Sequence, residues 1–287
     1  MTETPLFENV FVAMTSPINT KNKFLIDEVA LIKHLYFLQT NGINSLLVGG
    51  TTGEFFGLSV AERIYLLEFV KKNFSGNLIF NVSANSFSEI NMLISSAEKN
   101  GADAITIIPP YYIANAPTEG IIKFLQRVSD SSFLPCMLYN FTKHTQNKIT
   151  PEILKAVPHA ALKDSDKDEN LISHTTNYLC GGDSQILDFY SRGAKGVVSV
   201  MGNYAPSLVM KIWNELKSSE IENAKKTHKE ICEIAIHFRK TDQIARIKYA
   251  LSKILGSYPQ EISLPFLPAD NEAKKEIDKL FEMKILG

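Results

Sequence analysis

The stretch NGINSLLVGG, residues 41–50, joins a helix-ending signal to a short apolar run. A polar residue followed by glycine typically ends a helix. The run after it is continuous rather than alternating, which is typical of strands buried on both faces of a parallel sheet. The same form recurs in NGADAITIIPP at 100–110 and in RGAKGVVSV at 192–200. The chain therefore repeats a helix-then-strand unit.

Eight strands of this kind are expected along the chain. They lie near residues 10–15, 43–49, 78–83, 103–109, 135–140, 159–163, 178–182 and 195–200. Helical patterns fill the gaps, and one of them opens with Ser59 and Glu62 at the spacing of a capping box. Eight alternating units in about 200 residues fit a closed barrel better than an open sheet. The predicted fold class is α/β, a (β/α)8 TIM barrel.

The chain after the last strand is expected to be helical. A helix at 206–217 would close the barrel. Further helical segments would follow at 219–240, 242–255 and 271–285. No linker or low-complexity segment separates them from the barrel. We therefore expect a (β/α)8 barrel over residues 1–218 and a C-terminal helical extension over 219–287 that packs on it.

The composition argues against several classes of function. The chain has 287 residues, of which 45% are hydrophobic and 21% charged, as in globular proteins. A net charge of −1 indicates neither a nucleic-acid partner nor an anionic membrane. No apolar run approaches the ~20 residues of a transmembrane helix, and the start MTETPLFENVF does not resemble a signal peptide. Three cysteines without a CxxC pair suggest reduced thiols, so we expect a cytoplasmic protein.

Unusual residues fall at the C-terminal ends of the expected strands, where a (β/α)8 barrel builds its active site. They are GGTTGEF (49–55), PPYY (109–112), YN (139–140), Lys163, GGD (181–183) and SVMGNY (199–204). Each alone has an ordinary structural explanation, such as a turn, rim packing or a surface charge. Together they place one lysine, several tyrosines and two threonines on one face. The six histidines show no HxH or HxxxH pair, so we expect no metal.

This set of side chains suits Schiff-base chemistry on a keto acid. A lysine amine attacks the ketone, a phenol carries protons, and hydroxyl and backbone donors hold the carboxylate. Lys163 ends the strand within HAALKDSDKDEN (159–170), where a buried ammonium is costly. One interpretation is that it emerges into solvent beside Asp164. The other is that it stays partly desolvated, so that its amine is neutral and nucleophilic.

The motifs GGTTGEF, PPYY, YN and ALKDS, in this order and at this spacing, resemble the pyruvate-dependent class I aldolases. This superfamily includes dihydrodipicolinate synthase, N-acetylneuraminate lyase and 2-keto-3-deoxygluconate aldolase. The similarity runs from MTSP at 14–17 to the terminal helices. It implies a lyase that forms or cleaves a C–C bond between pyruvate and an aldehyde, with no cofactor. It also implies a homotetramer built as a dimer of dimers.

The resemblance also assigns roles to residues of this chain. Lys163 would form the Schiff base, and Tyr139 would be the central proton carrier. Thr51 would link Tyr139 to Tyr112, a tyrosine that in this superfamily reaches into a neighbouring subunit's site. Thr52, with the backbone N–H groups near Gly50, would bind the pyruvate carboxylate. The residues expected to bind the aldehyde are Gly182, Asp183, Val200 and His144.

The choice of aldehyde is expected to differ from that of dihydrodipicolinate synthase. There, YN leads into a proline and then an arginine that holds the substrate carboxylate. This chain reads YNFTKHTQ, with Thr142 at the proline place and His144 at the arginine place, and losing a guanidinium is not a conservative change. Later segments, among them YLCGGDSQIL (178–187), resemble archaeal 2-keto-3-deoxygluconate aldolases. We therefore expect a 2-keto-3-deoxy sugar acid aldolase, with dihydrodipicolinate synthase as the alternative.

Three further alternatives stay open. N-acetylneuraminate lyase also lacks the arginine, but it usually has a serine where this chain has Thr51. GTTGEFFGLS (50–59) resembles the ketodeoxyglucarate dehydratases, which share the lysine. A non-catalytic barrel that only binds keto acids is disfavoured by the combination of Lys163, Tyr139, Thr51 and Tyr112, because a binding protein needs no proton relay.

Overall fold

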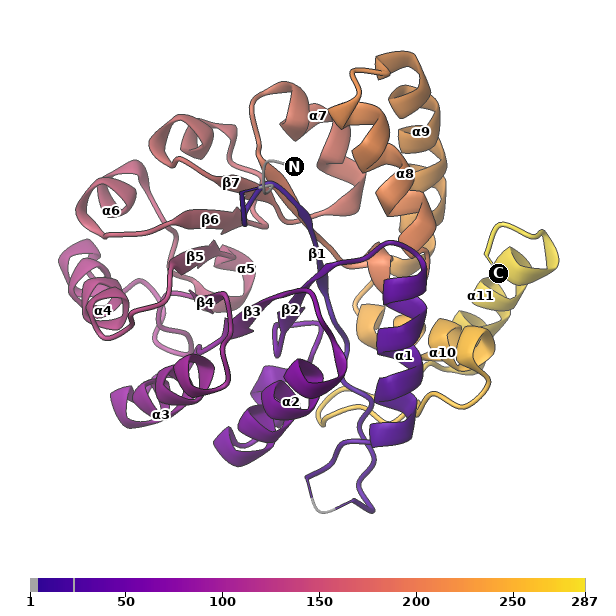
Figure 1. Cartoon of the computed structure of the whole chain (residues 1–287), viewed down its shortest axis with the longest axis horizontal. Coiled ribbons are helices and arrows are strands. Elements are labelled where there is room, and N and C mark those ends of the chain that lie inside the picture. Colours follow the sequence, from indigo (N-terminus) through magenta and orange to yellow (C-terminus); the bar gives the residue numbers. More distant parts are fainter. Residues whose placement is uncertain (1–4, 23, 287) are drawn as a thin grey trace.

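A closed barrel of eight parallel strands forms the centre of the computed structural model, which describes residues 5–22 and 24–286 (Figure 1). The strands are β1 Val10–Ala13, β2 Ser45–Val48, β3 Asn77–Asn81, β4 Ala104–Ile107, β5 Cys136–Asn140, β6 Ala161–Asp164, β7 Tyr178–Cys180 and β8 Gly196–Ser199. Each strand pairs with the next in sequence, and β8 pairs with β1. All eight expected strands are present, and the predicted (β/α)8 fold class is confirmed.

Helices cover the outside of the barrel. The α-helices are α1 Glu28–Thr40, α2 Val60–Asn73, α3 Phe87–Lys99, α4 Thr118–Asp130, α5 Thr142–Thr145, α6 Pro151–Ala156, α7 Ile186–Ser191, α8 Pro206–Lys217, α9 Ile221–Phe238, α10 Gln243–Leu255 and α11 Asn271–Glu282. The 3₁₀ helices are η1 Phe55–Gly57, η2 Glu169–His174, η3 Asp183–Gln185 and η4 Met201–Asn203. The unit between β6 and β7 has only η2 in place of an α-helix, because its first residues are held in a tight loop against the end of β6.

The inward-facing side chains at the centre of the barrel are mainly apolar. They are Phe11, Leu47, Ile79, Ala104, Met137, Ala161, Leu179 and Val198. Neighbouring strand residues such as Leu46, Leu78 and Leu162 face outward and pack against the helices. Because side chains alternate along a strand, the residue two positions beyond the apolar layer again points inward. On β5 and β6 these residues are Tyr139 and Lys163.

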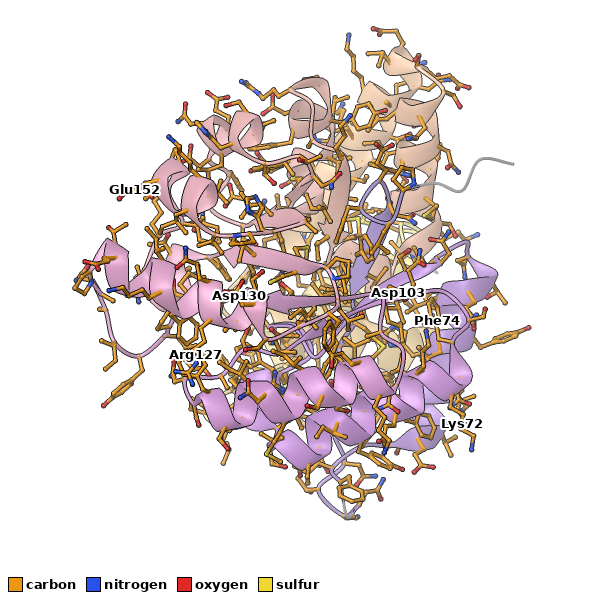
Figure 2. All side chains as sticks on the ribbon, turned by 60° about the vertical axis from the view of Figure 1, so that its left-hand side comes forward. Lys72, Phe74, Asp103, Arg127, Asp130 and Glu152 are labelled. Atoms are coloured by element: carbon orange, nitrogen blue, oxygen red, sulfur yellow. The ribbon has the colours of Figure 1, made fainter. Side chains whose placement is uncertain are left out.

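The helices present polar faces to solvent, as amphipathic barrel helices should. Lys72 on α2, Arg127 and Asp130 on α4, and Glu152 on α6, labelled in Figure 2, are all exposed. At the start of α2, Ser59 and Glu62 form the expected capping box, with both reciprocal hydrogen bonds present.

The C-terminal helices pack on one side of the barrel (Figure 1). Helix α9 packs on α7 and α8, α10 lies against α1 and α9, and α11 packs on α10. Their positions match the helical segments expected after residue 218, while the division of the chain at that residue stays a proposal. Within the described ranges, no helix is both long and apolar enough to cross a bilayer.

His34 lies on the inner face of α1 and is completely buried. Its ring makes an edge contact with Tyr258, with the ring centroids 5.5 Å apart. Burial lowers the pKa of His34 from 6.5 to about 4, and the nearby backbone of Asn203 opposes this effect only in part. The side chain is therefore neutral in the folded protein at neutral pH.

The buried imidazole predicts a loss of stability in mild acid. Below pH 6.5 the unfolded chain binds a proton at His34, whereas the folded chain does not until about pH 4. The folded state should lose about 3 kcal/mol across this window. The variant H34F keeps an aromatic ring at this position but cannot bind the proton. Its free energy of unfolding should therefore not fall by this amount when the pH is lowered. Urea unfolding at pH 7.5 and pH 4.5 measures the difference, and the exposed His174 provides a control as H174F. Equal acid sensitivity of wild type and H34F would contradict the assignment.

Candidate active site

Lys163 and Tyr139 lie side by side inside the barrel. Strands β5 and β6 pair in parallel, and their register sets Tyr139 opposite Lys163, two residues beyond the pair of Met137 and Ala161. The lysine and the tyrosine are each only 5% exposed. The Lys163 Nζ atom lies 3.6 Å from the centroid of the Tyr139 ring. The lysine therefore does not emerge into solvent at the end of its strand.

The next residue on each strand faces the other way and fixes the strand ends. Asn140 Nδ2 donates to Asp164 Oδ1 at 2.9 Å, and the Tyr178 hydroxyl donates to Asp164 Oδ2 at 2.7 Å. The backbone N–H groups of Asp166 and Asp168 also donate to this carboxylate. Burial raises the pKa of Asp164, while these hydrogen bonds oppose the rise. The network locks the register that brings Tyr139 and Lys163 together.

Aromatic and apolar side chains pack against Tyr139. Tyr139 stacks on Phe141, with centroids 5.9 Å apart, and packs in one cluster with Phe55 and Ile108. Across residues 5–22 and 24–286, no carboxylate forms an ion pair with Lys163. In the same part of the chain, no three His, Cys, Asp or Glu side chains are arranged to hold a metal ion. The surroundings of the lysine are thus apolar and aromatic rather than anionic.

The GGTTGEF loop leaves the C-terminal end of β2, the same barrel end as Lys163. Gly49 has φ +66°, and a Cβ atom on Gly50 would lie 2.5 Å from Leu47 Cδ2, so side chains are disfavoured at both positions. The N–H of Glu54 donates to the Thr51 carbonyl at 3.0 Å, which closes a tight turn. Within that turn Thr52 is buried and Thr51 is half-buried.

The two tyrosines after β4 have opposite environments. The Tyr111 ring makes an edge contact with Phe55 at 5.9 Å, and partial burial raises the pKa of Tyr111. Tyr112 is 92% exposed and adopts a φ of +76°, which is a strained conformation for a residue with a side chain. Within one chain, therefore, Tyr112 does not join Lys163 and Tyr139. Such strain often accompanies a functional constraint.

Asp183 is buried and its carboxylate is engaged with the end of β8. It accepts hydrogen bonds from the Ser199 hydroxyl and from the N–H groups of Val200 and Met201, the latter two at 3.1 Å and 2.9 Å. Burial raises the pKa of Asp183, and these donors oppose the rise. Asp183 thus holds the segment that carries Val200 in place. Gly182 directly precedes Asp183 in the chain. Contact of these three residues with an aldehyde stays a prediction.

His144 lies on α5, close to the reactive pair. Its ring contacts Phe141 edge-on with centroids 4.3 Å apart, and Phe141 in turn stacks on Tyr139. Partial burial, together with the charge of Lys143, lowers the pKa of His144. The imidazole is therefore uncharged at neutral pH and offers a neutral polar group where the resemblance expects a guanidinium.

Three polar residues near the site were given no role in the predictions made from the sequence. Thr106 lies two positions beyond Ala104 on β4, is 1% exposed, and has a hydroxyl without a hydrogen-bond partner among the described residues. The spacing from Ala104 is the signal that could have identified it. Asn140 and Asp164 appear in the quoted motifs YN and ALKDS, but these motifs do not indicate that the two side chains bond to each other.

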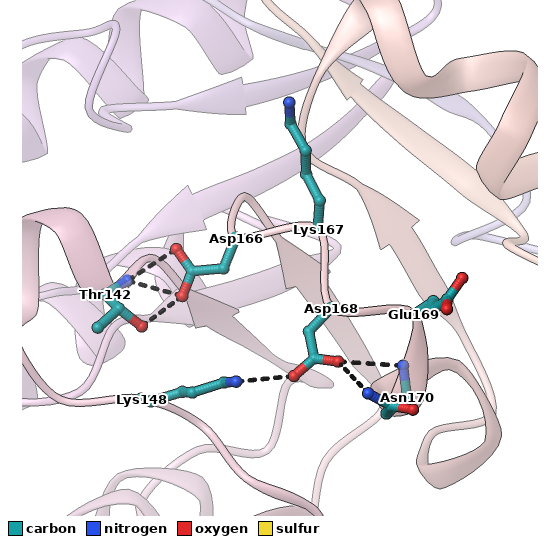
Figure 3. Close-up of a pocket in the computed structure, with 7 residues that line it drawn as sticks. All are labelled: Thr142, Lys148, Asp166, Lys167, Asp168, Glu169 and Asn170. Carbon is teal, nitrogen blue, oxygen red and sulfur yellow. Dashed lines mark hydrogen bonds and ion pairs between the residues drawn. The ribbon is translucent and has the colours of Figure 1, made fainter.

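A surface pocket lies beside the β6 loop (Figure 3). It is lined by Thr142, Lys148, Asp166, Lys167, Asp168, Glu169 and Asn170. Asp166 accepts from the Thr142 N–H, Asp168 pairs with Lys148 at 2.8 Å, and Lys167 points away from both. None of the four predicted catalytic residues lines this pocket. Its side chains mainly satisfy one another and hold the loop in place.

Comparison with known proteins identifies the family of the chain. The model of the dihydrodipicolinate synthetase family matches residues 6–284. The 4-hydroxy-tetrahydrodipicolinate synthase of Thermosipho africanus is 31% identical over 291 aligned residues, which cover 95% of this chain and 97% of the relative.

Solved structures share the fold over nearly the whole chain. YagE, a prophage protein of the dihydrodipicolinic acid synthase family from E. coli solved with pyruvate, has a TM-score of 0.89 at 22% identity and covers 98% of this chain and 100% of its own. A variant of the 2-keto-3-deoxygluconate aldolase of Sulfolobus solfataricus has a TM-score of 0.86 at 23% identity, covering 96% and 99%. The chain belongs to the dihydrodipicolinate synthetase family and is a lyase of the pyruvate-dependent aldolase superfamily.

Proposed function

We propose that this chain is a class I aldolase in which Lys163 forms an imine with pyruvate and that its preferred substrate is a 2-keto-3-deoxy sugar acid. The observation that carries the proposal is the register of β5 and β6, which holds Lys163 against Tyr139 inside the barrel. An amine that is desolvated and has no carboxylate partner is suited to nucleophilic attack. The activity would belong to carbohydrate metabolism in the cytoplasm.

The reaction follows from the groups at hand. The neutral amine of Lys163 attacks C2 of pyruvate, and loss of water gives an imine, which withdraws electrons when protonated. A proton then leaves the methyl group to give an enamine, whose carbon adds to the aldehyde carbonyl. In the reverse direction the same bond breaks. Tyr139, against the lysine, is placed to carry protons to and from the reacting oxygen.

The loop after β2 would hold the pyruvate carboxylate. Thr52 and the N–H groups of the tight turn supply hydrogen-bond donors at the barrel end where Lys163 lies. Thr51 would link Tyr139 to a second tyrosine. Since Tyr112 projects into solvent from its own chain, we place it in the site of a neighbouring subunit within a dimer of dimers.

The environment of His144 supports a neutral aldehyde. Its lowered pKa favours the uncharged imidazole at neutral pH, so His144 does not supply the positive charge with which a guanidinium binds a substrate carboxylate. It can still hydrogen-bond to hydroxyl groups. A sugar-derived aldehyde such as glyceraldehyde carries hydroxyls and no charge, and it matches this environment better than aspartate semialdehyde does.

Dihydrodipicolinate synthase activity is the second candidate. It is supported by the relative from Thermosipho africanus, whose name is 4-hydroxy-tetrahydrodipicolinate synthase and whose identity to this chain is 31%. Lys143, next to His144, is a cation that could attract the carboxylate of an amino-aldehyde. The choice between the candidates rests on the aldehyde, because the pyruvate half of the reaction is common to both.

Trapping with borohydride tests the imine. Pyruvate and borohydride should leave a reduced adduct on Lys163, identified by peptide mapping. The variant K163M should lose the adduct and all aldolase activity, while K167M, which removes the exposed lysine four residues later, should keep both. An adduct on another lysine, or none on the folded wild type, would overturn the proposed function.

An arginine at position 144 tests the aldehyde preference. The wild type should cleave 2-keto-3-deoxygluconate to pyruvate and glyceraldehyde faster than it turns over aspartate semialdehyde. The variant H144R should shift the ratio of kcat/KM values toward aspartate semialdehyde by about tenfold or more, because a guanidinium binds a carboxylate bidentately. The neighbouring K143R is the control and should leave the ratio unchanged. If the wild type prefers aspartate semialdehyde, dihydrodipicolinate synthase becomes the first candidate.

Mixing two inactive variants tests the shared site. K163M lacks the nucleophile and Y112F lacks the relay hydroxyl, so each alone should be nearly inactive. If Tyr112 serves the neighbouring subunit, a mixed dimer contains one intact site, and random exchange should restore about a quarter of the wild-type activity. No recovery after verified subunit exchange would show that Tyr112 acts within its own chain or not at all.

A further inference from the structure

A completely buried ion pair links the GTTGE motif to the C-terminal helices. Glu54, the last residue of the motif, forms an ion pair with Lys248 on α10, and both side chains are 0% exposed. The two residues are far apart in the sequence: Glu54 follows the second strand of the barrel, and Lys248 lies on α10, after the last strand. The reaction described above uses Thr51 and Thr52 from this motif but gives no role to Glu54.

Stability alone does not account for this ion pair. Removing two charges from water costs several kcal/mol per ion, and replacing such a pair by apolar side chains is often neutral or stabilising. Burial lowers the pKa of Lys248 despite the attraction of Glu54, which reflects the same desolvation cost. The pair is better explained by the geometry that it fixes.

Glu54 closes the turn that carries the two threonines. It adopts φ +60°, in the left-handed region that residues with side chains rarely enter. Its N–H donates to the Thr51 carbonyl at 3.0 Å. Its second carboxylate oxygen accepts from the N–H of Ser263 at 2.7 Å, while Lys248 Nζ donates to the Glu261 carbonyl at 2.6 Å. One carboxylate thus connects the turn to α10 and to the segment that follows it.

Further contacts join the same two parts of the chain. A Cβ atom on Gly57 would lie 2.2 Å from Ser263 Oγ, so the Ser263 side chain packs directly against the backbone of Gly57. The rings of Phe56 and Phe266 are in contact, with centroids 5.5 Å apart. On the other side, Ser16 Oγ donates to the Gly53 carbonyl at 2.8 Å. The turn is therefore clamped between the end of β1 and the C-terminal segment.

We infer that Glu54 and Lys248 are positioning residues that hold the Thr51–Thr52 turn in the geometry that receives the pyruvate carboxylate. This inference rests on the proposed function, since it assigns the turn to pyruvate. It gives the C-terminal extension a part in catalysis without contact with substrate. Loosening the pair should weaken pyruvate binding rather than only destabilise the fold.

The variant K248M tests the inference, because methionine fills much of the lysine volume without a charge. The pyruvate concentration that gives half-maximal borohydride adduct on Lys163 should rise by about tenfold or more. Irreversibly misfolded protein would lower the amount of adduct but not shift this concentration. Reversible unfolding would raise it in inverse proportion to the folded fraction, so the folded fraction is measured first by circular dichroism. Deuterium exchange of the peptide spanning residues 49–58 should also accelerate, which reports the turn without any activity assay.

Arg246 offers a matched control on the same helix. It is buried and pairs at 2.8 Å each with Asp242, the N-cap residue of α10, and with Glu276 on α11, and neither partner belongs to the turn. The variant R246M should lower the melting temperature but leave both the pyruvate half-saturation and the exchange of residues 49–58 unchanged. Should K248M fail to fold, the double variant E54Q/K248M removes both charges together, avoids an unpaired buried ion, and should show the same shift in pyruvate half-saturation.

The outcomes separate this inference from the proposed function. Wild-type trapping on Lys163 with an unshifted pyruvate half-saturation in folded K248M overturns the inference and leaves the aldolase proposal intact. An equal shift in R246M also overturns it, because the effect would then be general destabilisation. Absence of a wild-type adduct overturns both.

Discussion

The register between β5 and β6 is the constraint on which the candidate site depends. A closed parallel barrel leaves each inward position only two neighbours on the adjacent strands, and alternation determines which residues point inside. Met137 and Ala161 fill the apolar layer, so Tyr139 and Lys163 must be the next inward pair. A slip by one residue would turn the lysine outward toward the helices.

Buried carboxylates hold the strand ends around this pair. Asp164 fixes the end of β6 through Asn140 and Tyr178, and Asp183 fixes the end of β8. Glu54 does the same for the turn after β2, with Lys248 as its counter-ion. Burying a carboxylate costs free energy that its hydrogen bonds and counter-ions offset, and these directional contacts define the geometry of each strand end. These contacts tie the loops that carry the predicted chemistry to the strand ends.

Local sequence was sufficient to predict the strands and the barrel end that carries the site. The Gly-then-apolar repeat encodes each unit, and the (β/α)8 rule places Lys163, Tyr139 and the threonines together. The Asn140–Asp164 bond and the Glu54–Lys248 pair could not be predicted, because both depend on contacts between distant segments. The 3₁₀ helix η2 was also missed, since hydrogen bonds to Asp164, rather than helix propensity, shape that loop. The positive φ of Tyr112 is likewise not revealed by PPYY.

The central claim is that the barrel delivers one lysine to a keto acid, with the turn after β2 holding the carboxylate. A crystal structure of the enzyme soaked with pyruvate tests it most directly. The account predicts continuous density from Lys163 Nζ to C2 of the ligand, with the carboxylate hydrogen-bonded at Thr52 and the Glu54–Lys248 pair intact. Pyruvate bound without a covalent link to Lys163, or with its carboxylate away from the turn, would contradict the account.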